Sequence, residues 1–415
     1  MVWPTCKLDE LGFVGRGKSK HRPRNEPSLY GGPYPFFQTG DIKAADLYLT
    51  NYTQTYSEKG LAQSKLWEPG ALCITIAANI AETAILGVRG CFPDSVVGFV
   101  PDREKCDVRF IKYFTDTIKL RMQNVSRGTT QDNLSLEKLL TFVFPAPPLP
   151  EQQKIAGILS AYDDLIKNNT RRIKILEQMA QAIYREWFVH FRFPGHEKVK
   201  LVESPLGKIP QEWNVVRIGE RFKTVLGGTP SRAKPEFWAD GTIPWINSGK
   251  INELRIVEAS ELITAEALAN SATKLMPRRT TVLAITGATL GQVSLLEIEV
   301  CANQSVVGIV DSSGVFSEYL YLKTKEVIGE LVNHASGGAQ QHINKDVVNE
   351  FEIVLPPEPL VIRFNKLCKP FFDLLVNKLH KNANLRRTRD LLLPKLISGE
   401  LDVLELDIEN AEKVV

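Results

Sequence analysis

The chain contains two copies of one sequence pattern, about 210 residues apart. The corresponding segments are Cys91 and Cys301, Ser-Val-Val-Gly at 95–98 and 305–308, Trp3 and Trp213, 35–42 and 244–251, 128–131 and 337–340, and the proline pairs at 147–148 and 356–357. Repetition constrains the fold strongly, because each copy must form a unit of the same architecture. Two diverged copies predict a pseudo-twofold molecule that binds something with two halves.

Composition predicts a cytoplasmic globular protein. With 415 residues, of which 43% are hydrophobic and 24% charged, the chain can form two or three domains with their own cores. Its longest apolar stretch, at 71–78, is far shorter than the ~18 residues that cross a bilayer, so we expect no membrane contact. The six cysteines form no Cys-x-x-Cys pair, which favours a reducing compartment. A net charge of +3 is too small to indicate a partner.

Each copy divides into a globular part with short apolar runs and one long helix. Runs such as 72–76 and 282–286, separated by glycine and proline, predict short buried strands. We predict an α+β fold of two pseudo-repeated globular domains, each followed by a long helix, with the two helices packed as an antiparallel coiled coil. The predicted boundaries are 1–150 (first domain), 151–190 (first helix), 191–212 (linker), 213–359 (second domain), 360–397 (second helix) and 398–415 (tail). The acidic tail either covers an edge or folds back on the N-terminus.

A heptad pattern supports the helix pairing. The predicted seam contains Ile155, Leu159, Tyr162, Ile166, Asn169, Ile173 and Leu176 in the first helix, and Phe364, Phe371, Lys378, Leu385 and Leu392 in the second. Both seams have a polar residue near the middle, and such residues fix register. We therefore hypothesise that Asn169 and Lys378 face one another. In the alternative, each helix is buried separately in its own domain.

The motifs that would indicate an enzyme fail on their context. Residues 12–19 match a nucleotide-binding glycine loop, but no buried strand precedes them and the prolines that follow exclude a helix. The same defects exclude an S-adenosylmethionine site, and no motif for methylating an amino group follows. No nuclease motif is present, and the histidines lack metal-ligand spacing. We expect no catalytic residue, metal ligand or cofactor in this chain.

A basic loop indicates nucleic acid. Five cations within nine residues, Arg16, Lys18, Lys20, Arg22 and Arg24, have no acidic residue among them. Such charge density is typical of phosphate binding, and arginine also suits guanine edges. Its alternative is a solvated surface loop. The matching segment at 227–234, Gly-Gly-Thr-Pro-Ser-Arg-Ala-Lys, is again polar and partly basic, which favours nucleic-acid binding.

Two further segments complete the candidate DNA-binding set. The Gly-Thr-Thr-Gln and Gly-Gly-Ala-Gln turns let a backbone approach a phosphate closely, and glutamine suits adenine; their alternative is a tight structural turn. Phe36, Phe37 and Trp245 are expected in the core instead. The remaining candidates are Ser19, Gln38, Thr39, Arg127, Thr129, Thr130, Gln131, Gly228, Thr229, Ser231, Arg232, Lys234, Asn247, Ser248, Lys250, Gln340 and Gln341.

Taken together, the chain resembles the specificity subunit of type I restriction-modification enzymes. The motifs that carry the resemblance are Gly-Gly-Thr-Pro-Ser at 227–231, Ile-Pro-Trp-Ile-Asn-Ser-Gly at 243–249, the Gly-x-x-Gln turns, and the segments at 147–156, 179–189 and 206–213. They cover essentially the whole chain, and their duplicated order is more specific than any one of them. The second helix departs from the pattern at its start, 359–362, and at its end, Leu393-Pro394. We therefore expect modification subunits to dock unequally at the two ends of the molecule.

The resemblance implies a subunit that recognises DNA without catalysing a reaction. Two target-recognition domains would each read one half of a gapped sequence in double-stranded DNA, held apart by the helices. The helices would dock two modification subunits, and two restriction subunits would join through that core. S-adenosylmethionine, ATP and Mg²⁺ would then belong to those partners. The rival interpretations are a coiled-coil scaffold that binds proteins and a self-contained restriction-modification polypeptide, and the missing active-site motifs argue against the second.

Overall fold

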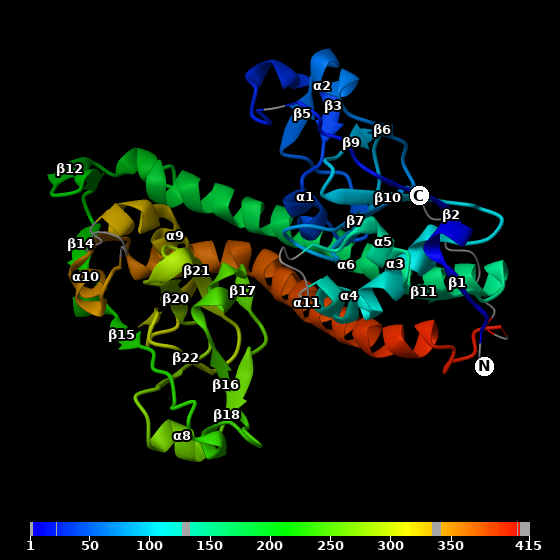
Figure 1. Cartoon of the computed structure of the whole chain (residues 1–415). Coiled ribbons are helices and arrows are strands. Elements are labelled where there is room, and N and C mark those ends of the chain that lie inside the picture. The colour runs from blue at the N-terminus through cyan, green and yellow to red at the C-terminus, as the bar shows by residue number, and fades with distance from the viewer. Residues whose placement is uncertain (1–2, 22, 127–132, 334–341, 405, 407–415) are drawn as a thin grey trace. The chain divides into compact units, whose positions relative to one another are not determined.

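The protein is described by a computed structural model that covers residues 3–21, 23–126, 133–333, 342–404 and 406. The chain forms two compact units (Figure 1). Unit 1 contains Met1–Asn168 and Asn384–Val415, and unit 2 contains Asn169–Ala383. Each unit therefore includes one globular domain and parts of both long helices.

The described residues of unit 1 form three sheets. The strand β1 (Thr5–Lys7) pairs with β11 (Val143–Pro145). A five-stranded sheet has the order β2 (Gly12–Arg16), β10 (Val96–Pro101), β7 (Leu72–Thr75), β8 (Thr83–Leu86) and β4 (Tyr48–Leu49). A four-stranded sheet has the order β5 (Gln54–Tyr56), β3 (Tyr30–Phe36), β9 (Gly90–Cys91) and β6 (Leu66–Trp67). The helices are α1 (Thr39–Ala44), α2 (Glu58–Ala62), α3 (Val108–Thr117), α4 (Lys119–Ser126) and α5 (Leu136–Leu139).

Unit 2 repeats this topology strand for strand. β14 (Asn214–Arg217) pairs with β24 (Glu352–Leu355). The five-stranded sheet has the order β15 (Lys223–Leu226), β23 (Val306–Val310), β20 (Thr281–Ala284), β21 (Val293–Leu296) and β17 (Arg255–Ile256). The four-stranded sheet has the order β18 (Glu261–Ile263), β16 (Ile243–Ile246), β22 (Val300–Ala302) and β19 (Leu275–Met276). Its helical segments are α7 (Ile218–Arg221), η5 (Pro235–Phe237), η6 (Ser248–Asn252), α8 (Ala265–Ala269), η7 (Gly287–Thr289), α9 (Ser317–Asn333) and α10 (Lys345–Glu350).

Strand register confirms the predicted repeat. Phe36 pairs with Cys91 across parallel strands in unit 1, and Trp245 pairs with Cys301 in the same way in unit 2. These residues belong to the segments that the sequence matched. Phe36, Phe37 and Trp245 are each at most 2% exposed, so they are core residues as predicted.

The five-stranded sheet of unit 1 lies between helices and the second sheet. Leu72 and Ile74 of β7 pack in the core that contains Phe110 of α3, whereas Cys73 packs in a second core with Trp67 of the four-stranded sheet. Side chains on a strand alternate between its two faces, so a strand buried on both sides reads as a continuous apolar run. This explains the unbroken apolar run at 72–76.

The two long helices run antiparallel within each unit. They are α6 (Leu149–Tyr184), which continues as a π-helical turn over Arg185–Val189, and α11 (Glu358–Ile397). In unit 2, Asn169 Nδ2 of α6 donates a hydrogen bond to Asn382 Oδ1 of α11 (3.0 Å). In unit 1, Arg389 of α11 forms an ion pair with Asp163 of α6. Later residues of one helix thus meet earlier residues of the other, so the predicted antiparallel packing is confirmed.

The predicted seam is correct on α6 and displaced on α11. Every predicted α6 seam residue is buried or half-buried. On α11, however, the partner of Asn169 is Asn382, so the hypothesis that Lys378 faces Asn169 is wrong by four residues, about one helical turn. The most buried row of α11 consists of Val361, Cys368, Leu375, Asn382 and Leu396. Of the predicted row Phe364 is fully buried, and Phe371, Lys378, Leu385 and Leu392 are only half-buried.

Parts of the segments after the two helices are described. The predicted linker contains a short turn (η4, His196–Lys198) and a hairpin of β12 (Leu201–Ser204) with β13 (Gly207–Pro210). The tail folds back on unit 1: Val403 is fully buried in its core, and Lys154 Nζ donates to the carbonyl oxygens of Leu404 and Leu406 (2.7 and 3.1 Å). A Cβ atom on Gly399 would lie 2.9 Å from the Trp3 ring, so the start of the tail folds back on the N-terminus, one of the two alternatives. Among the described residues, no helix combines the length and apolar character needed to cross a membrane.

Candidate nucleic-acid interface

Several loops of unit 1 lie together along the edge of the five-stranded sheet that is formed by the ends of its strands. Arg16, Val97, Ile74 and Thr83 lie in a row across β2, β10, β7 and β8. Because these neighbouring strands are antiparallel, the segments 17–21 with 23–24, 92–95 and 76–82 all leave the sheet at this edge. The Phe37 amide donates to the Cys91 carbonyl oxygen (2.8 Å), which brings the start of α1 to the same place. We call this set of four segments the loop edge.

Unit 2 has an equivalent loop edge. Leu226, Val307, Leu283 and Val293 form the corresponding row across β15, β23, β20 and β21. The segments that leave there are 227–234, 303–305 and 285–292. The Asn303 amide donates to the Ile246 carbonyl oxygen (3.0 Å), and this places the start of η6 beside them. The chain therefore presents the same group of loops twice.

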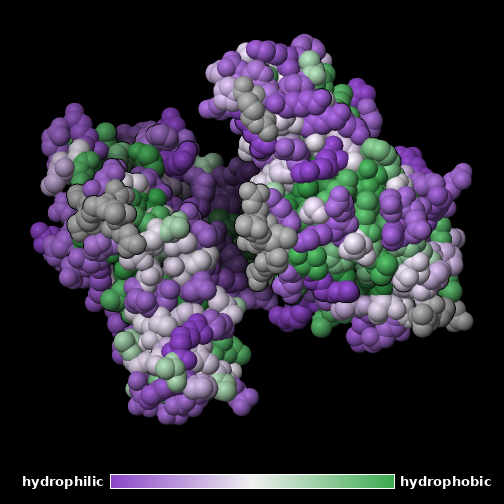
Figure 2. Space-filling view, in the orientation of Figure 1, coloured by the Kyte–Doolittle hydropathy of each residue, from purple (hydrophilic) through white to green (hydrophobic). Residues whose placement is uncertain are grey.

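The basic loop of unit 1 lies on its loop edge. Arg16 ends β2, and Lys18 and Lys20 follow it with exposed side chains, whereas Ser19 is only 8% exposed. Residues 17–21 and 23–29 lie beside the lobe that contains α2, β3 and β5, and the coloured surface of this lobe is mainly hydrophilic (Figure 2). Two lysines in this loop are thus available to phosphate groups. The strand at 12–16 also supports the rejection of a nucleotide-binding loop there.

Asp94 fixes the two arginines at the ends of this loop. The Arg16 guanidinium donates from Nε and Nη2 to the main-chain oxygen of Asp94 (3.1 and 2.8 Å). The Arg24 guanidinium donates from Nη2 to both carboxylate oxygens of Asp94 (2.8 and 3.1 Å). Arg24 is 51% and Asp94 41% exposed, so the pair lies at the surface and contributes little to stability. Its consequence is orientation, because both guanidinium groups are held on the same turn.

The next candidates in unit 1 occupy the start of α1. Gln38 precedes this helix and Thr39 is its first residue. Gln38 Nε2 donates to Gln54 Oε1 (3.0 Å), and Lys43 Nζ of α1 donates to Asn79 Oδ1 (3.4 Å). The second contact ties α1 to segment 76–82. The sequence did not single out this segment, although Ala78 and Ala81 both have positive φ angles (61° and 62°) that strain a residue with a side chain.

In unit 2 the glycine-rich segment is fixed by its backbone. The Gly228 amide donates to the Ala302 carbonyl oxygen (2.8 Å), and a Cβ atom on Gly228 would lie 2.6 Å from the carbonyl carbon of Ala272. Only glycine allows this close approach. The hydroxyl of Thr229 donates to the side-chain oxygen of Gln304, which holds that exposed amide at the loop edge.

The cations of the unit 2 loop are more strongly engaged than those of unit 1. Arg232 donates to both carboxylate oxygens of Glu261 (2.6 and 2.7 Å) and lies over the ring of Trp238, 3.5 Å from its centroid. These hydrogen bonds hold the pKa of Glu261 below its usual range. Lys234 lies over the Phe237 ring (4.8 Å). Ser231 contributes its carbonyl oxygen, which accepts from the Trp238 indole (3.1 Å).

The candidate residues of the Asn-Ser-Gly-Lys segment lie at the start of η6. The side chain of Asn247 accepts from the Gly249 amide (2.9 Å) and so caps this turn, and Ser248 is its first residue. Lys250 pairs with Glu253 (2.7 Å). Segment 285–292 lies against η6, with Gly287 at φ 68°. Arg22, Arg127, Thr129, Thr130, Gln131, Gln340 and Gln341 lie outside the described residues.

Sequence reasoning missed the residues at the tips of the two central turns. Asp94 and Gln304 each lie one residue before a serine of the repeated Ser-Val-Val-Gly segment. A signal was present, because residues 92–94 and 302–304 differ completely although cysteine and serine flank both. A position that varies between fixed neighbours is a reasonable place to look for specificity.

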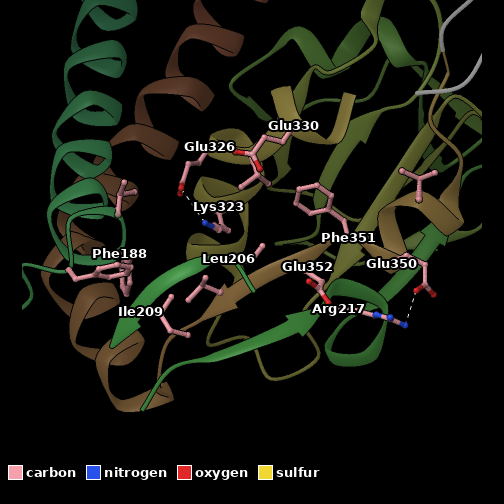
Figure 3. Close-up of a pocket in the computed structure, with 15 residues that line it drawn as sticks. Phe188, Leu206, Ile209, Arg217, Lys323, Glu326, Glu330, Glu350, Phe351 and Glu352 are labelled. Carbon is pink, nitrogen blue, oxygen red and sulfur yellow. Dashed lines mark hydrogen bonds and ion pairs between the residues drawn. The ribbon is translucent and has the colours of Figure 1, made fainter. Parts of the chain in front are cut away.

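The large cavity in unit 2 is not suited to nucleic acid. It encloses about 790 Å³ and lies between α9, β24 and the linker hairpin (Figure 3). Its wall combines apolar residues with four glutamates, Glu326, Glu330, Glu350 and Glu352. Lys323 and Arg217 neutralise only two of them, at 3.1 and 2.9 Å. The excess negative charge would repel phosphate.

Comparison with known proteins identifies the two domains. A family model described as the type I restriction modification DNA specificity domain matches residues 2–178 and again 210–360. These two matches cover more than half of the chain and coincide with the two copies of the repeat. The chain belongs to this family. Each loop edge therefore lies in a DNA specificity domain.

Relatives of this chain match along most of its length. The type I restriction enzyme MjaIX specificity subunit of Methanocaldococcus jannaschii is 26% identical over 97% of this chain and 94% of its own. The HindI specificity subunit of Haemophilus influenzae is 24% identical over 66% of this chain and 72% of its own. The crystal structure of a type I restriction-modification S subunit from M. genitalium covers 95% of this chain and 96% of its own, with a TM-score of 0.59 and 15% identity. That likeness shows a shared fold.

Proposed function

We propose that this chain is the DNA-recognition subunit of a type I restriction-modification complex. Each domain reads one half of a gapped target in double-stranded DNA through its loop edge. The observation that carries the proposal is the duplication of this edge, with different side chains on the same frame. Two such edges in one chain suit a target whose halves differ in sequence.

The long helices have two roles in this proposal. An α-helix rises ~1.5 Å per residue, so the 40 residues of α11 extend over roughly 60 Å. This exceeds one turn of DNA, ~34–36 Å, and is sufficient to fix the distance between the halves. The helices also dock two modification subunits, and two restriction subunits join the complex through these modification subunits. Exposed apolar residues on α6 and α11, Leu165, Ile175, Met179, Ile362, Leu367, Leu374 and Leu391, provide surface for such partners.

In this proposal the chain catalyses nothing alone. S-adenosylmethionine, ATP and Mg²⁺ bind to the partner subunits, where adenine methylation, translocation and cleavage take place. The function is to position the partners on DNA, and the location is cytoplasmic.

A pair of lysines provides the first test. Lys18→Ala with Lys20→Ala should weaken DNA binding by the assembled complex. The slope of log affinity against log salt should fall by about 1 for each phosphate group that the variant no longer neutralises. Lys198→Ala with Lys200→Ala is the matched control, because these exposed linker lysines have the same spacing and charge. The control should leave affinity and slope unchanged.

Equal behaviour of the two double variants would contradict the proposed interface. If the complex also failed to prefer any DNA sequence while it assembled normally, the coiled-coil scaffold would become the better interpretation.

A further inference from the structure

The two turns that carry Asp94 and Gln304 are held by matching sets of backbone hydrogen bonds. In unit 1 four bonds fix 92–95: Gly17 N to Val96 O (2.9 Å), Lys18 N to Phe92 O (3.1 Å), Val96 N to Pro93 O (3.0 Å) and Ile76 N to Ser95 O (2.9 Å). In unit 2 the same four fix 302–305: Gly227 N to Val306 O (3.0 Å), Gly228 N to Ala302 O (2.8 Å), Val306 N to Asn303 O (3.1 Å) and Ile285 N to Ser305 O (2.9 Å). The backbone frame is therefore the same in both domains.

The side chains on this frame differ in chemistry. Asp94 is an anion that gathers two arginines, Arg16 through its carbonyl oxygen and Arg24 through its carboxylate. At the equivalent position Gln304 is a neutral amide, held by the Thr229 hydroxyl. A rigid turn with a variable tip satisfies the geometric requirement for reading a base edge, because the reading group must be positioned before DNA binds.

The side chains on the two turns match different bases. An arginine has five N–H donors, and Arg24 engages Asp94 through Nη2 alone, so its Nη1 and the second Nη2 hydrogen remain for an end-on pair of hydrogen bonds. Arginine pairs with the two acceptors of guanine in the major groove. Gln304 uses its oxygen toward Thr229 and retains both amide hydrogens and a second lone pair. Glutamine pairs with the donor and acceptor that adenine presents.

We propose that positions 94 and 304 are corresponding specificity-determining positions. Asp94 is a positioning residue that presents Arg24 to a guanine in the half-site of unit 1, and Gln304 contacts an adenine in the half-site of unit 2. The proposal rests on the proposed function and deepens it, because it assigns a base to each domain. Contacts of the same groups to phosphate would be the competing explanation, and they carry no sequence information directly.

The test maps the methylated motif of the full-length chain co-expressed with its modification subunit. The variants are Asp94→Ala and Gln304→Ala, with Asp94→Asn and Gln304→Asn as conservative versions. Glu68→Ala is the control for Asp94, because Glu68 forms the same type of exposed pair with Arg89 outside the loop edge. Gln211→Ala, an exposed linker glutamine, is the control for Gln304. Competition binding with duplexes changed at single base pairs gives a second readout that does not require methylation.

Gln304→Ala should relax one A·T position in one half of the motif, with roughly 5- to 150-fold less discrimination, and leave the other half and the gap unchanged. Asp94→Ala should relax one G·C position in the other half, and both controls should keep the wild-type motif. An unchanged motif, a uniform loss of affinity for every duplex, or changes in the same half for both variants would overturn the inference. A wild-type complex that methylates no two-part motif would instead reject the proposed function itself.

Discussion

Replacing Asn169 by leucine should destabilise unit 2 by about 1–3 kcal/mol, although leucine is the more hydrophobic residue. Asn169 is 7% and Asn382 2% exposed, and a 3.0 Å hydrogen bond joins their side chains between α6 and α11. Leucine at 169 removes the Nδ2 donor of this hydrogen bond to the buried Asn382 Oδ1. The cost is the desolvation of that oxygen, which exceeds the net value of a hydrogen bond, about 1 kcal/mol.

The double variant distinguishes this reasoning from simple loss of packing. Asn382→Leu alone also removes the bond from Asn382 Nδ2 to Thr170 Oγ1 (3.1 Å), so it should cost at least as much as Asn169→Leu. With leucine at both positions no buried amide remains, and stability should return close to that of the wild type or exceed it. The two single costs then add to about 2–6 kcal/mol while the double variant costs close to nothing, so the double-mutant cycle should give a favourable coupling of about 2–6 kcal/mol.

Urea unfolding of the full-length variants, followed by far-UV circular dichroism, measures this coupling. Asn168→Leu is the matched control, because Asn168 is the neighbouring residue on α6 and is exposed; its effect should stay within about 0.5 kcal/mol. If the two single substitutions leave the unfolding midpoint unchanged, or if their effects simply add, the buried amide pair does not hold the helices as described.

Three further predictions concern unit 2 and the cores. Arg255→Met should lower the free energy of unfolding by about 3–5 kcal/mol. Arg255 is fully buried between Glu297 and Glu318 (2.6 and 2.7 Å), and its loss leaves the charges of these glutamates less compensated. Thermal unfolding measures the effect. Burial alone would raise the pKa of Glu297, but the charge and hydrogen bonds of Arg255 outweigh it and lower that pKa below its ordinary 4.5. The stabilising contribution should thus be complete above pH 4.5 and decline as pH falls further, and Arg255→Met should flatten this decline; an unchanged pH profile of unfolding would contradict it. Gly98→Ala should destabilise the protein by roughly 1–3 kcal/mol, since the added Cβ would lie 2.5 Å from the buried Trp67 ring. Gly157→Ala on α6 meets no neighbour and should stabilise the protein by about 0.5–1 kcal/mol. Equal melting temperatures of the two variants would refute this difference in packing.

The sequence predicted the repeat and the helix pair because both leave regular patterns. The seam of α6 follows a heptad row whose members are mostly apolar. On α11 the row that faces α6 contains Asn382 and Arg389, and hydrophobicity alone favoured the neighbouring row with Phe371 and Leu385. This row tolerates the buried Asn382 and the half-buried Arg389 because each finds a partner on α6, Asn169 and Asp163 respectively. Such pairing depends on both helices at once, so no single helix could reveal it.

The loop edge could be predicted only in part. The basic loop was visible from its charge, but its position depends on β2 pairing with β10, whose paired residues are about 80 apart in the sequence. Long-range strand order of this kind leaves no local signal. Asp94 was missed for the same reason: it is one acid in an ordinary turn until the fold brings Arg16 and Arg24 to it.

Mapping of adenine methylation across a plasmid tests the central claim most directly. The chain is expressed alone and with its modification subunit, and co-purification confirms that the complex forms. We expect methylation at one two-part motif with a fixed gap, and only when both chains are present. Methylation by this chain alone, methylation at an ungapped motif, or none from a complex that assembles stably would contradict the account.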